Sequence, residues 1–265
     1  MAIAIINDIH LYYEIHGNGV PLMLVAGLAS DSQSWQPIIR DLAQHCRVII
    51  LDNRGVGRTR TSDADISIQM IADDCIALIR YLGLPSVNLL GHSMGGFVAQ
   101  DWAIRYPECV DKLILAGTSA FNSERNNALF LDWVSYLESG MDLELWFRNI
   151  FYWIFSRRFF ENEEIVNDAI RFAIEYPYPQ SKVLFRNQVK AVAEFNCMEG
   201  LPNITSKTLT ICGKEDMLFP PEECSKFSEA IPDAHFSVIS NAAHSIHMEN
   251  PHAFTDCVLG FLSDC

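Results

Sequence analysis

Two hydrophobic patterns alternate along this chain of 265 residues. The first is a short, nearly continuous apolar run, which is typical of a strand buried on both faces of a parallel sheet. Such runs occur at 22–26, 48–51, 87–90, 113–116 and 208–212. Ahead of them, residues 3–15 alternate apolar and polar positions on either side of Asn7 and Asp8, which predicts a β-hairpin.

The second pattern has the period of a helix. Between Ile71 and Leu82, apolar side chains recur every three or four residues, and Gly83 then predicts the end of the helix. The same spacing returns after Pro251, a residue that suits a first helical turn. Strands that alternate with helices predict an α/β fold, with a mostly parallel central sheet and helices on both faces.

The alternation stops in residues 120–200, which contain only helix-like segments and 17 of the 29 aromatic residues. This stretch is too long for one crossover between strands. We therefore expect a helical cap, inserted into a core domain of residues 1–119 and 201–265. The densest aromatic stretch, residues 146–160, predicts an apolar lining for a substrate pocket, although any one of its rings can instead pack inside the cap. The candidate lining residues are Trp146, Phe147, Phe151, Trp153, Phe155 and Phe160.

Charge and cysteine content narrow the function classes. The chain has 19 basic and 33 acidic residues, a formal net charge of −14, and such a surface repels nucleic-acid phosphates and anionic lipid. No apolar run reaches the roughly 18 residues of a membrane span, and the first residues lack a basic signal-peptide region. The eight cysteines are scattered without a C-x-x-C pair. We expect a cytoplasmic protein with no metal, no cofactor and no nucleic-acid or membrane partner.

One motif carries chemistry. Residues 91–95 read G-H-S-M-G, and they stand between a predicted buried strand and a predicted helix. In this context Ser93 lies on a sharp strand-to-helix turn, with its hydroxyl above the carboxyl edge of the sheet. Glycine at 91 and 95 relieves crowding around the turn because it has no Cβ. The start of the following helix adds positive potential where an anion would form.

With these features the chain resembles the α/β-hydrolase-fold family. Four other motifs follow the family's order, with Ala26 as one departure where the family commonly has His. These are 26–28 for the oxyanion loop, 52–59 for the D-x-R-G-x-G-x-S turn, 213–216 for the acid loop, and 244–251 for H-x-x-x-x-E-x-P.

The resemblance implies a catalytic triad in the chain order Ser93, Asp216 and His244. A serine hydroxyl needs a base, and a neutral imidazole supplies one at neutral pH. His247 is the alternative base, but only His244 has the family's spacing, and we expect His247 to be partly exposed. The imidazole needs an acid partner, for which Asp216 is preferred over Glu215, expected to be a solvated loop charge.

Two backbone N–H groups are expected to form the oxyanion hole, those of Leu28 and Met94. His92 is expected to line the sheet side of the turn and not to act as the base. Arg54 is expected to be a hydrogen-bonding residue of its glycine-rich turn, because loops need such partners. The other histidines are expected at the surface, and these are His10, His16, His45, His235 and His252.

Together these features predict a serine hydrolase that cleaves a small, largely apolar carboxylic ester or lactone, similar to the carboxylesterase and enol-lactonase branch. Alternatives with the same triad are a C–C bond hydrolase and a cofactor-free perhydrolase. A pimeloyl-carrier-protein methyl esterase would need a basic cap, whereas residues 120–200 hold eight basic and twelve acidic residues, with a possible local patch at Arg148, Arg157 and Arg158. A non-catalytic ligand-binding protein on the same fold is the alternative outside enzymes.

Overall fold

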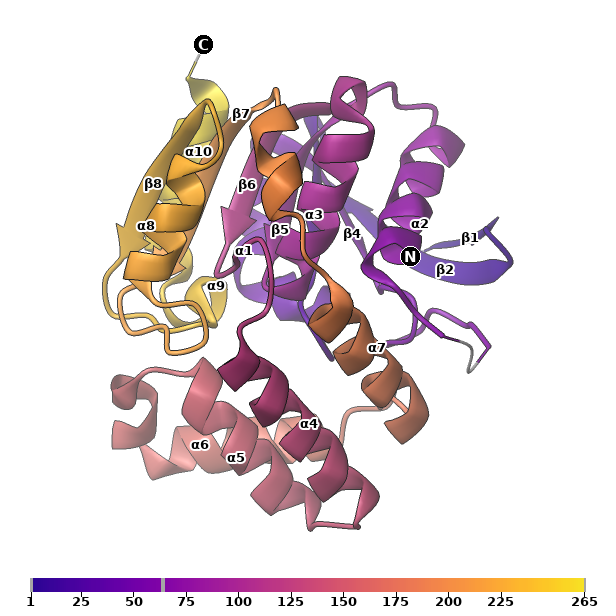
Figure 1. The fold of residues 1–265 in the computed structure, drawn as a ribbon. Helices are drawn as coiled ribbons and strands as arrows, with labels where there is room; N and C mark the ends of the chain where they lie inside the picture. The colour runs from indigo at the N-terminus through magenta and orange to yellow at the C-terminus, as the bar shows by residue number, and fades with distance from the viewer. Residues whose placement is uncertain (1, 63–64, 265) are drawn as a thin grey trace.

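The computed structural model describes residues 2–62 and 65–264. In this part of the chain, eight strands form one sheet in the order β1-β2-β4-β3-β5-β6-β7-β8 (Figure 1). The β1–β2 and β2–β4 pairs are antiparallel, and all pairs from β4 to β8 are parallel. The strands are β1 (Ala2–Ile6), β2 (Ile9–His16), β3 (Val20–Val25), β4 (Cys46–Leu51), β5 (Val87–His92), β6 (Val110–Ala116), β7 (Lys207–Gly213) and β8 (Ala234–Ile239).

The predicted hairpin is confirmed as β1 and β2. Asn7 and Asp8 join the two strands with φ angles of +44° and +60°. Positive φ at both central residues defines the tight turn whose twist matches that of paired strands, and Asn and Asp tolerate this conformation best among residues with a Cβ.

Helices follow the predicted alternation. The apolar pattern from Ile71 to Leu82 forms α2, and the segment after Pro251 forms α10, so both predicted helices are confirmed. The α-helices are α1 (Gln36–Leu42), α2 (Ile68–Tyr81), α3 (Met94–Arg105), α4 (Glu124–Glu138), α5 (Leu143–Ile154), α6 (Glu163–Ile174), α7 (Lys182–Glu194), α8 (Pro221–Glu229), α9 (Ile246–Glu249) and α10 (Pro251–Ser263). Shorter 3₁₀ turns are η1 (Ser32–Trp35), η2 (Pro107–Cys109), η3 (Arg157–Glu161) and η4 (Met198–Asn203).

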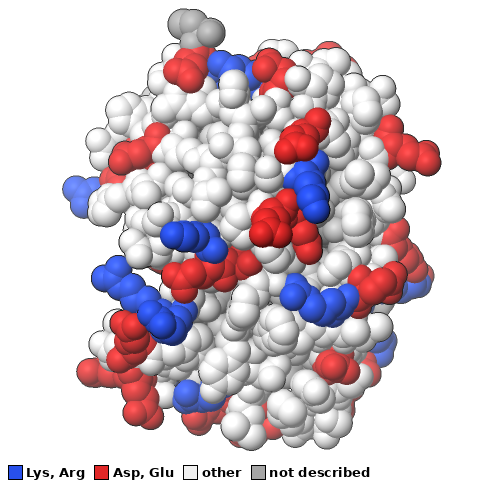
Figure 2. Space-filling view, turned by 60° about the vertical axis from the view of Figure 1, so that its left-hand side comes forward, with Lys and Arg blue, Asp and Glu red and all other residues white. Residues whose placement is uncertain are grey.

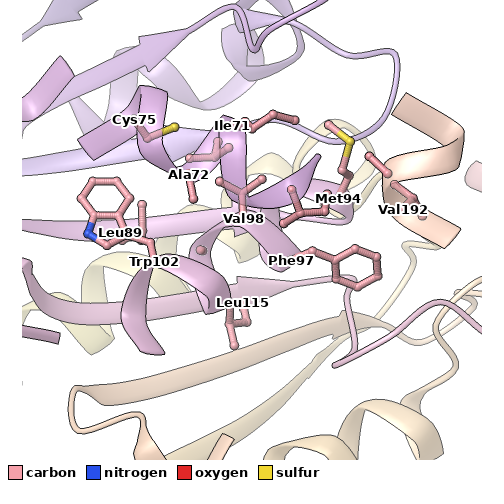
Figure 3. Close-up of a cluster of buried hydrophobic side chains, with 14 of the residues drawn as sticks. Ile71, Ala72, Cys75, Leu89, Met94, Phe97, Val98, Trp102, Leu115 and Val192 are labelled. Atoms are coloured by element: carbon pink, nitrogen blue, oxygen red, sulfur yellow. The ribbon is translucent and has the colours of Figure 1, made fainter. Parts of the chain in front are cut away.

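Both faces of the central strands are buried, which explains their continuous apolar runs. In β3, Met23 and Val25 face the layer of α2, α3 and α8, whereas Leu22 and Leu24 face α1, α9 and α10. Figure 3 shows the first layer, where side chains of α3 such as Val98 and Trp102 lie among side chains of α2, β5 and β6.

Four helices lie between β6 and β7. The two ends of this helical segment lie side by side. Phe121 forms an isolated antiparallel β-bridge with Asn196, and the Cys197 N–H donates to the Ala120 carbonyl over 3.0 Å. Helices α4, α5 and α6 are grouped away from the sheet, and α7 runs back from them toward α3 (Figure 1). These helices cover the edge at which β5 ends.

The surface carries the acidic character of the sequence. On the face shown in Figure 2, acidic side chains are spread widely, several of them beside basic ones. Within residues 2–62 and 65–264, no helix has the length and apolar character needed to cross a membrane.

Candidate active site

Ser93 occupies a strained turn between β5 and α3. Its φ of +55° lies in the left-handed region, which residues with a Cβ rarely adopt, and such strain clusters at functional sites. The turn is held because the Ser93 N–H donates to the Ala116 carbonyl over 2.9 Å. A Cβ at Gly91 would overlap the Gly95 carbonyl, and one at Gly95 would overlap the Val25 carbonyl. The two glycines are therefore a steric requirement of the turn.

His244 and Asp216 form a buried pair beside this turn. Nδ1 of the imidazole lies 3.0 Å from Oδ2 of the carboxylate. The other oxygen, Oδ1, accepts the backbone N–H groups of Leu218 and Phe219 over 2.8 and 2.9 Å, which fixes the carboxylate's orientation. A carboxylate on Nδ1 keeps the proton there and leaves the Nε2 lone pair free to accept another. The pair is arranged as a base and its orienting acid.

Ser93 and His244 line the same cavity, whose volume is about 80 Å³. Among the described residues, no hydrogen bond joins the Ser93 hydroxyl to the imidazole. Catalytic hydrogen bonds are often long before substrate binds and tighten in the complex. The structure thus places Ser93 and His244 at one cavity and joins His244 to Asp216.

The loop expected to complete an oxyanion hole lies against the nucleophile. A Cβ at Gly27 would lie 3.1 Å from Ser93 Cβ, so the backbone that leads into Leu28 passes close to the hydroxyl. Met94 is the first residue of α3, and N–H groups in a helix's first turn lack intrahelical partners. Leu28 borders the cavity at Ser93, and Met94 directly follows Ser93, which also borders it.

The neighbouring histidines have separate positions. His92 is buried, and its Nε2–H donates to the His244 carbonyl over 2.8 Å, so it supports the base's backbone. The expectation that His247 is partly exposed is wrong: the side chain is 2% exposed and packs on Trp35 with ring centroids 4.6 Å apart. The short helix α9 turns it inward. Burial, with the nearby His244, lowers the pKa of His247 to about 3.

Other polar residues singled out in the sequence are structural. Arg54 makes a paired contact with Asp74 of α2, from Nε over 2.8 Å and from Nη2 over 2.7 Å, so it joins its turn to a helix. Glu215 is exposed, next to the buried Asp216. Four of the five remaining histidines are exposed and His16 is half-buried. In the described ranges, no cluster of three or more His, Cys, Asp or Glu side chains could hold a metal ion.

None of the six aromatic residues predicted to line the pocket borders the cavity at Ser93, although two of them, Trp146 and Phe147, border a second cavity beside it. The cap side chains that line the cavity at Ser93 are Phe130, Trp133, Ile150, Ile154 and Phe185.

The orientation of α5 about its own axis explains why its aromatic residues do not line the cavity at Ser93. Ile150 and Ile154, one turn apart, face the cavity, whereas Phe151 faces α6 in a separate apolar cluster. Phe155 and Phe160 pack around that cluster, and Trp153 lies under the Arg125 guanidinium.

Trp146 and Phe147 instead line a second cavity of about 350 Å³. This cavity adjoins the first, because Ala29 and Phe185 border both. Sequence analysis missed Phe130 and Trp133 because they lie outside the densest aromatic stretch. The two residues are three positions apart, a spacing that places both on one face of a helix and that could have indicated a shared lining role.

Comparisons with known proteins agree with this fold. A family model described as "alpha/beta hydrolase fold" matches residues 20–251, so the chain belongs to the α/β-hydrolase fold family. A relative named "Putative carbamate hydrolase RutD", from Azorhizobium caulinodans, is 28% identical over 259 residues, which cover 97% of each chain. "Putative non-heme bromoperoxidase BpoC" of Mycobacterium tuberculosis is 27% identical, covering 96% of this chain and 98% of its own.

Solved structures extend the comparison. The enol-lactonase from Burkholderia xenovorans LB400 has a TM-score of 0.90 at 23% identity and covers 99% of this chain and 100% of its own, a likeness of fold. A thermophilic esterase from Thermogutta terrifontis has a TM-score of 0.85 at 27% identity and covers 96% and 93%. Relatives of nearly full length that are named hydrolases support the assignment of this chain as an enzyme, a hydrolase of this fold.

Proposed function

We propose that the protein is a serine hydrolase that cleaves a small, largely apolar carboxylic ester or lactone through an acyl-enzyme. One observation carries the proposal. An imidazole oriented by a buried carboxylate, His244 with Asp216, borders the same cavity as a serine on a strained elbow. Side chains arranged in this way activate a hydroxyl toward a carbonyl carbon.

In the proposed reaction, His244 Nε2 takes the proton of Ser93 as its oxygen bonds to the carbonyl carbon. The backbone N–H groups of Leu28 and Met94 stabilise the negative oxygen that forms. The imidazole then gives its proton to the leaving alkoxide, and the ester bond breaks. Water, deprotonated by the same imidazole, attacks the acyl-enzyme. The imidazole then returns that proton to the Ser93 oxygen as the acyl bond breaks and the acid is released.

The two adjoining cavities differ in volume, which favours a substrate whose acyl group and alcohol group differ in size. A space of about 80 Å³ at Ser93 suits a small group, and its cap walls are apolar. The neighbouring space of about 350 Å³ has aromatic walls at Trp146 and Phe147. A compact acyl group with a larger apolar partner, or the reverse, fits both spaces.

The test is covalent labelling of the intact protein with a fluorophosphonate. We expect one label per chain, on the peptide that contains Ser93, and none on Ser93→Ala. That variant should lose p-nitrophenyl acetate turnover by about a thousandfold or more while its thermal unfolding is unchanged, because the hydroxyl supplies chemistry and not packing. Labelling at another residue, or full turnover by Ser93→Ala, would contradict the nucleophile assignment.

Carbamate cleavage is the second candidate, favoured by full-length relatives named for it. A side-by-side panel of p-nitrophenyl esters, lactones and alkyl carbamates separates the two, since the preferred class shows the highest kcat/KM. Carrier-bound methyl esters, C–C substrates and peracid formation belong in the same panel. Tight binding of a panel compound without labelling or turnover would instead support a non-catalytic protein.

We further propose that the protein acts on small molecules in the cytoplasm and not on nucleic acid or membranes. The net charge of −14 supports this, because it opposes binding to polyanions.

A further inference from the structure

A polar side chain lies on the apolar face by which α7 packs against the core. Five residues of α7 are buried, and four of them are apolar: Phe185, Val189, Ala191 and Val192. The fifth is Gln188. Figure 3 shows Val192 against the core cluster around α3. Gln188 is 0% exposed. A buried amide is costly unless it is hydrogen-bonded, so its partners indicate what it does.

Both ends of the Gln188 amide are used. Nε2 donates to the Arg54 carbonyl over 2.9 Å, while Oε1 accepts from Gln180 Nε2 over 3.0 Å and from the Ala29 N–H over 3.3 Å. A carbonyl can only accept and a backbone N–H can only donate, so these partners fix which end of the amide is which. The cap thereby bonds directly to the backbone of the loop after β3.

Ala29 needs this support. Its φ is +56°, a left-handed conformation that carries a steric penalty for a residue with a Cβ. It is a central residue of a tight turn closed by the Ser30 N–H and the Gly27 carbonyl over 3.3 Å. The other central residue is Leu28, the expected oxyanion donor. A rotation of the peptide between residues 28 and 29 would relieve Ala29 and change the backbone at Leu28.

We infer that Gln188 is a positioning residue that holds the oxyanion loop in its strained conformation through the Ala29 N–H. The inference rests on the proposed function, because it concerns the stabilisation of the reaction's oxyanion. The oxyanion loop of the core then keeps this conformation only while α7 of the cap packs against it. Gln188 lies outside the residues that line the cavity at Ser93, so it acts on the reaction through the loop.

The test compares Gln188→Met with a matched control. Methionine keeps the length and flexibility of the side chain but removes the acceptor, so we expect kcat on p-nitrophenyl acetate to fall on the order of tenfold or more with KM nearly unchanged. Val192→Ala, on the same face of α7, should lower the melting temperature by a similar amount and leave kcat unchanged.

Rescue distinguishes positioning from general damage. Glycine adopts positive φ without penalty, so adding Ala29→Gly to Gln188→Met should restore most of the lost kcat. An equal fall in kcat in Gln188→Met and Val192→Ala, or no recovery with Ala29→Gly, would overturn the inference.

A readout independent of turnover separates this inference from the proposed function. We expect the Ala29 amide to be protected from hydrogen exchange in the wild type and to exchange at least tenfold faster in Gln188→Met, at the same global stability as the Val192→Ala control. Equal exchange in both variants would contradict the inference even if the protein proves to be inactive on esters. Absent fluorophosphonate labelling with a protected Ala29 amide would instead reject the proposed function alone.

Discussion

At the residue scale, the site depends on side chains whose ionisation is set by burial. The His92 ring lies between two other imidazoles, with its centroid 4.8 Å from that of His244 and 4.7 Å from that of His247. Burial lowers the pKa of His92 and of His247, and the charge of neighbouring imidazoles lowers it further. Both therefore stay neutral at neutral pH, so no second positive charge lies beside His244.

This arrangement predicts a pH dependence of stability. The pKa of His247 falls from an ordinary 6.5 to about 3 in the folded state, so below pH 6.5 the unfolded chain binds the proton first. Its contribution to stability is present above pH 6.5 and is lost as the pH falls toward 3, by up to about 1.4 kcal/mol per pH unit. In urea unfolding between pH 7 and 5, His247→Phe should therefore reduce the slope of unfolding free energy against pH.

The control is His252→Gln, which replaces a histidine whose side chain is 89% exposed. This variant should keep the wild-type slope. If His247→Phe also keeps it, the imidazole at 247 is not held neutral by its surroundings.

At the element scale, the close approach of α3 to β3 decides the geometry of the nucleophile turn. Gly95 lies in the first turn of α3, against the Val25 carbonyl at the end of β3. This contact sets the height at which Ser93 stands above the sheet. The distance between α3 and β3 therefore depends on the absence of a side chain at Gly95.

Gly95→Ala tests this spacing. The added methyl group overlaps backbone that cannot move without shifting a strand, so the variant should be destabilised by roughly 1–3 kcal/mol or more and lose hydrolase activity. Gly260→Ala in α10 is the matched control. Nothing lies within 4 Å of its Cβ position, and alanine favours the helix, so stability should rise by about 0.5–1 kcal/mol. Thermal and urea unfolding of both variants would check the opposite signs.

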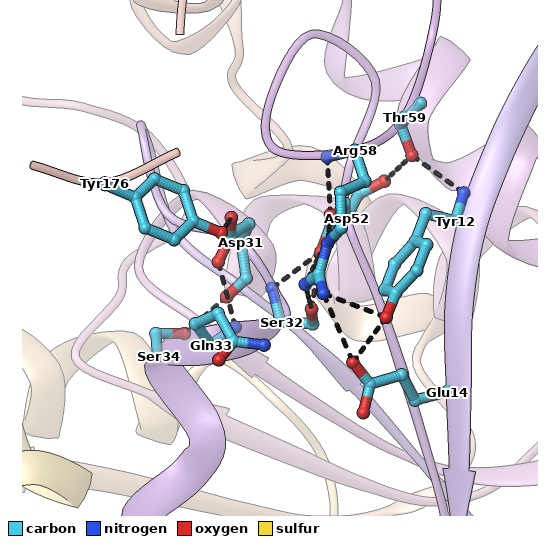
Figure 4. Close-up of polar contacts among 10 residues, drawn as sticks. All are labelled: Tyr12, Glu14, Asp31, Ser32, Gln33, Ser34, Asp52, Arg58, Thr59 and Tyr176. Atoms are coloured by element: carbon cyan, nitrogen blue, oxygen red, sulfur yellow. Dashed lines mark hydrogen bonds and ion pairs between the residues drawn. The ribbon is translucent and has the colours of Figure 1, made fainter. Parts of the chain in front are cut away.

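At the scale of the whole molecule, cap and core are joined by polar contacts on the side of β2. The Tyr176 hydroxyl of the cap donates to the Asp31 carboxylate of the core, and Arg58 lies 5.5 Å from the Tyr178 ring. Arg58 itself is held by Asp52 over 3.0 Å (Figure 4). Burial and the bond to Asp31 raise the pKa of Tyr176, so it remains a donor. These contacts hold the segment between α6 and α7 over the larger cavity.

Tyr176→Phe removes this hydrogen bond and keeps the ring. We expect a modest loss of stability, about 1–3 kcal/mol because the acceptor is charged, and faster proteolysis within the cap. Tyr152→Phe is the control, since its ring is 51% exposed and stacks on Phe160 away from this network. Equal cleavage of the two variants in limited proteolysis would show that the contact does not restrain the cap.

The amino-acid sequence by itself determined the order of strands and helices, the turn at Ser93 and the loops that carry Asp216 and His244. Those features depend on local periodicity and on residue types within short segments, which can be read along the chain. Tertiary structure decided which side of α5 faces the cavity, how deeply His247 is buried and that Gln188 reaches Ala29. Each of these depends on how one element rotates and docks against another that is distant in sequence, and packing of the whole chain sets that rotation.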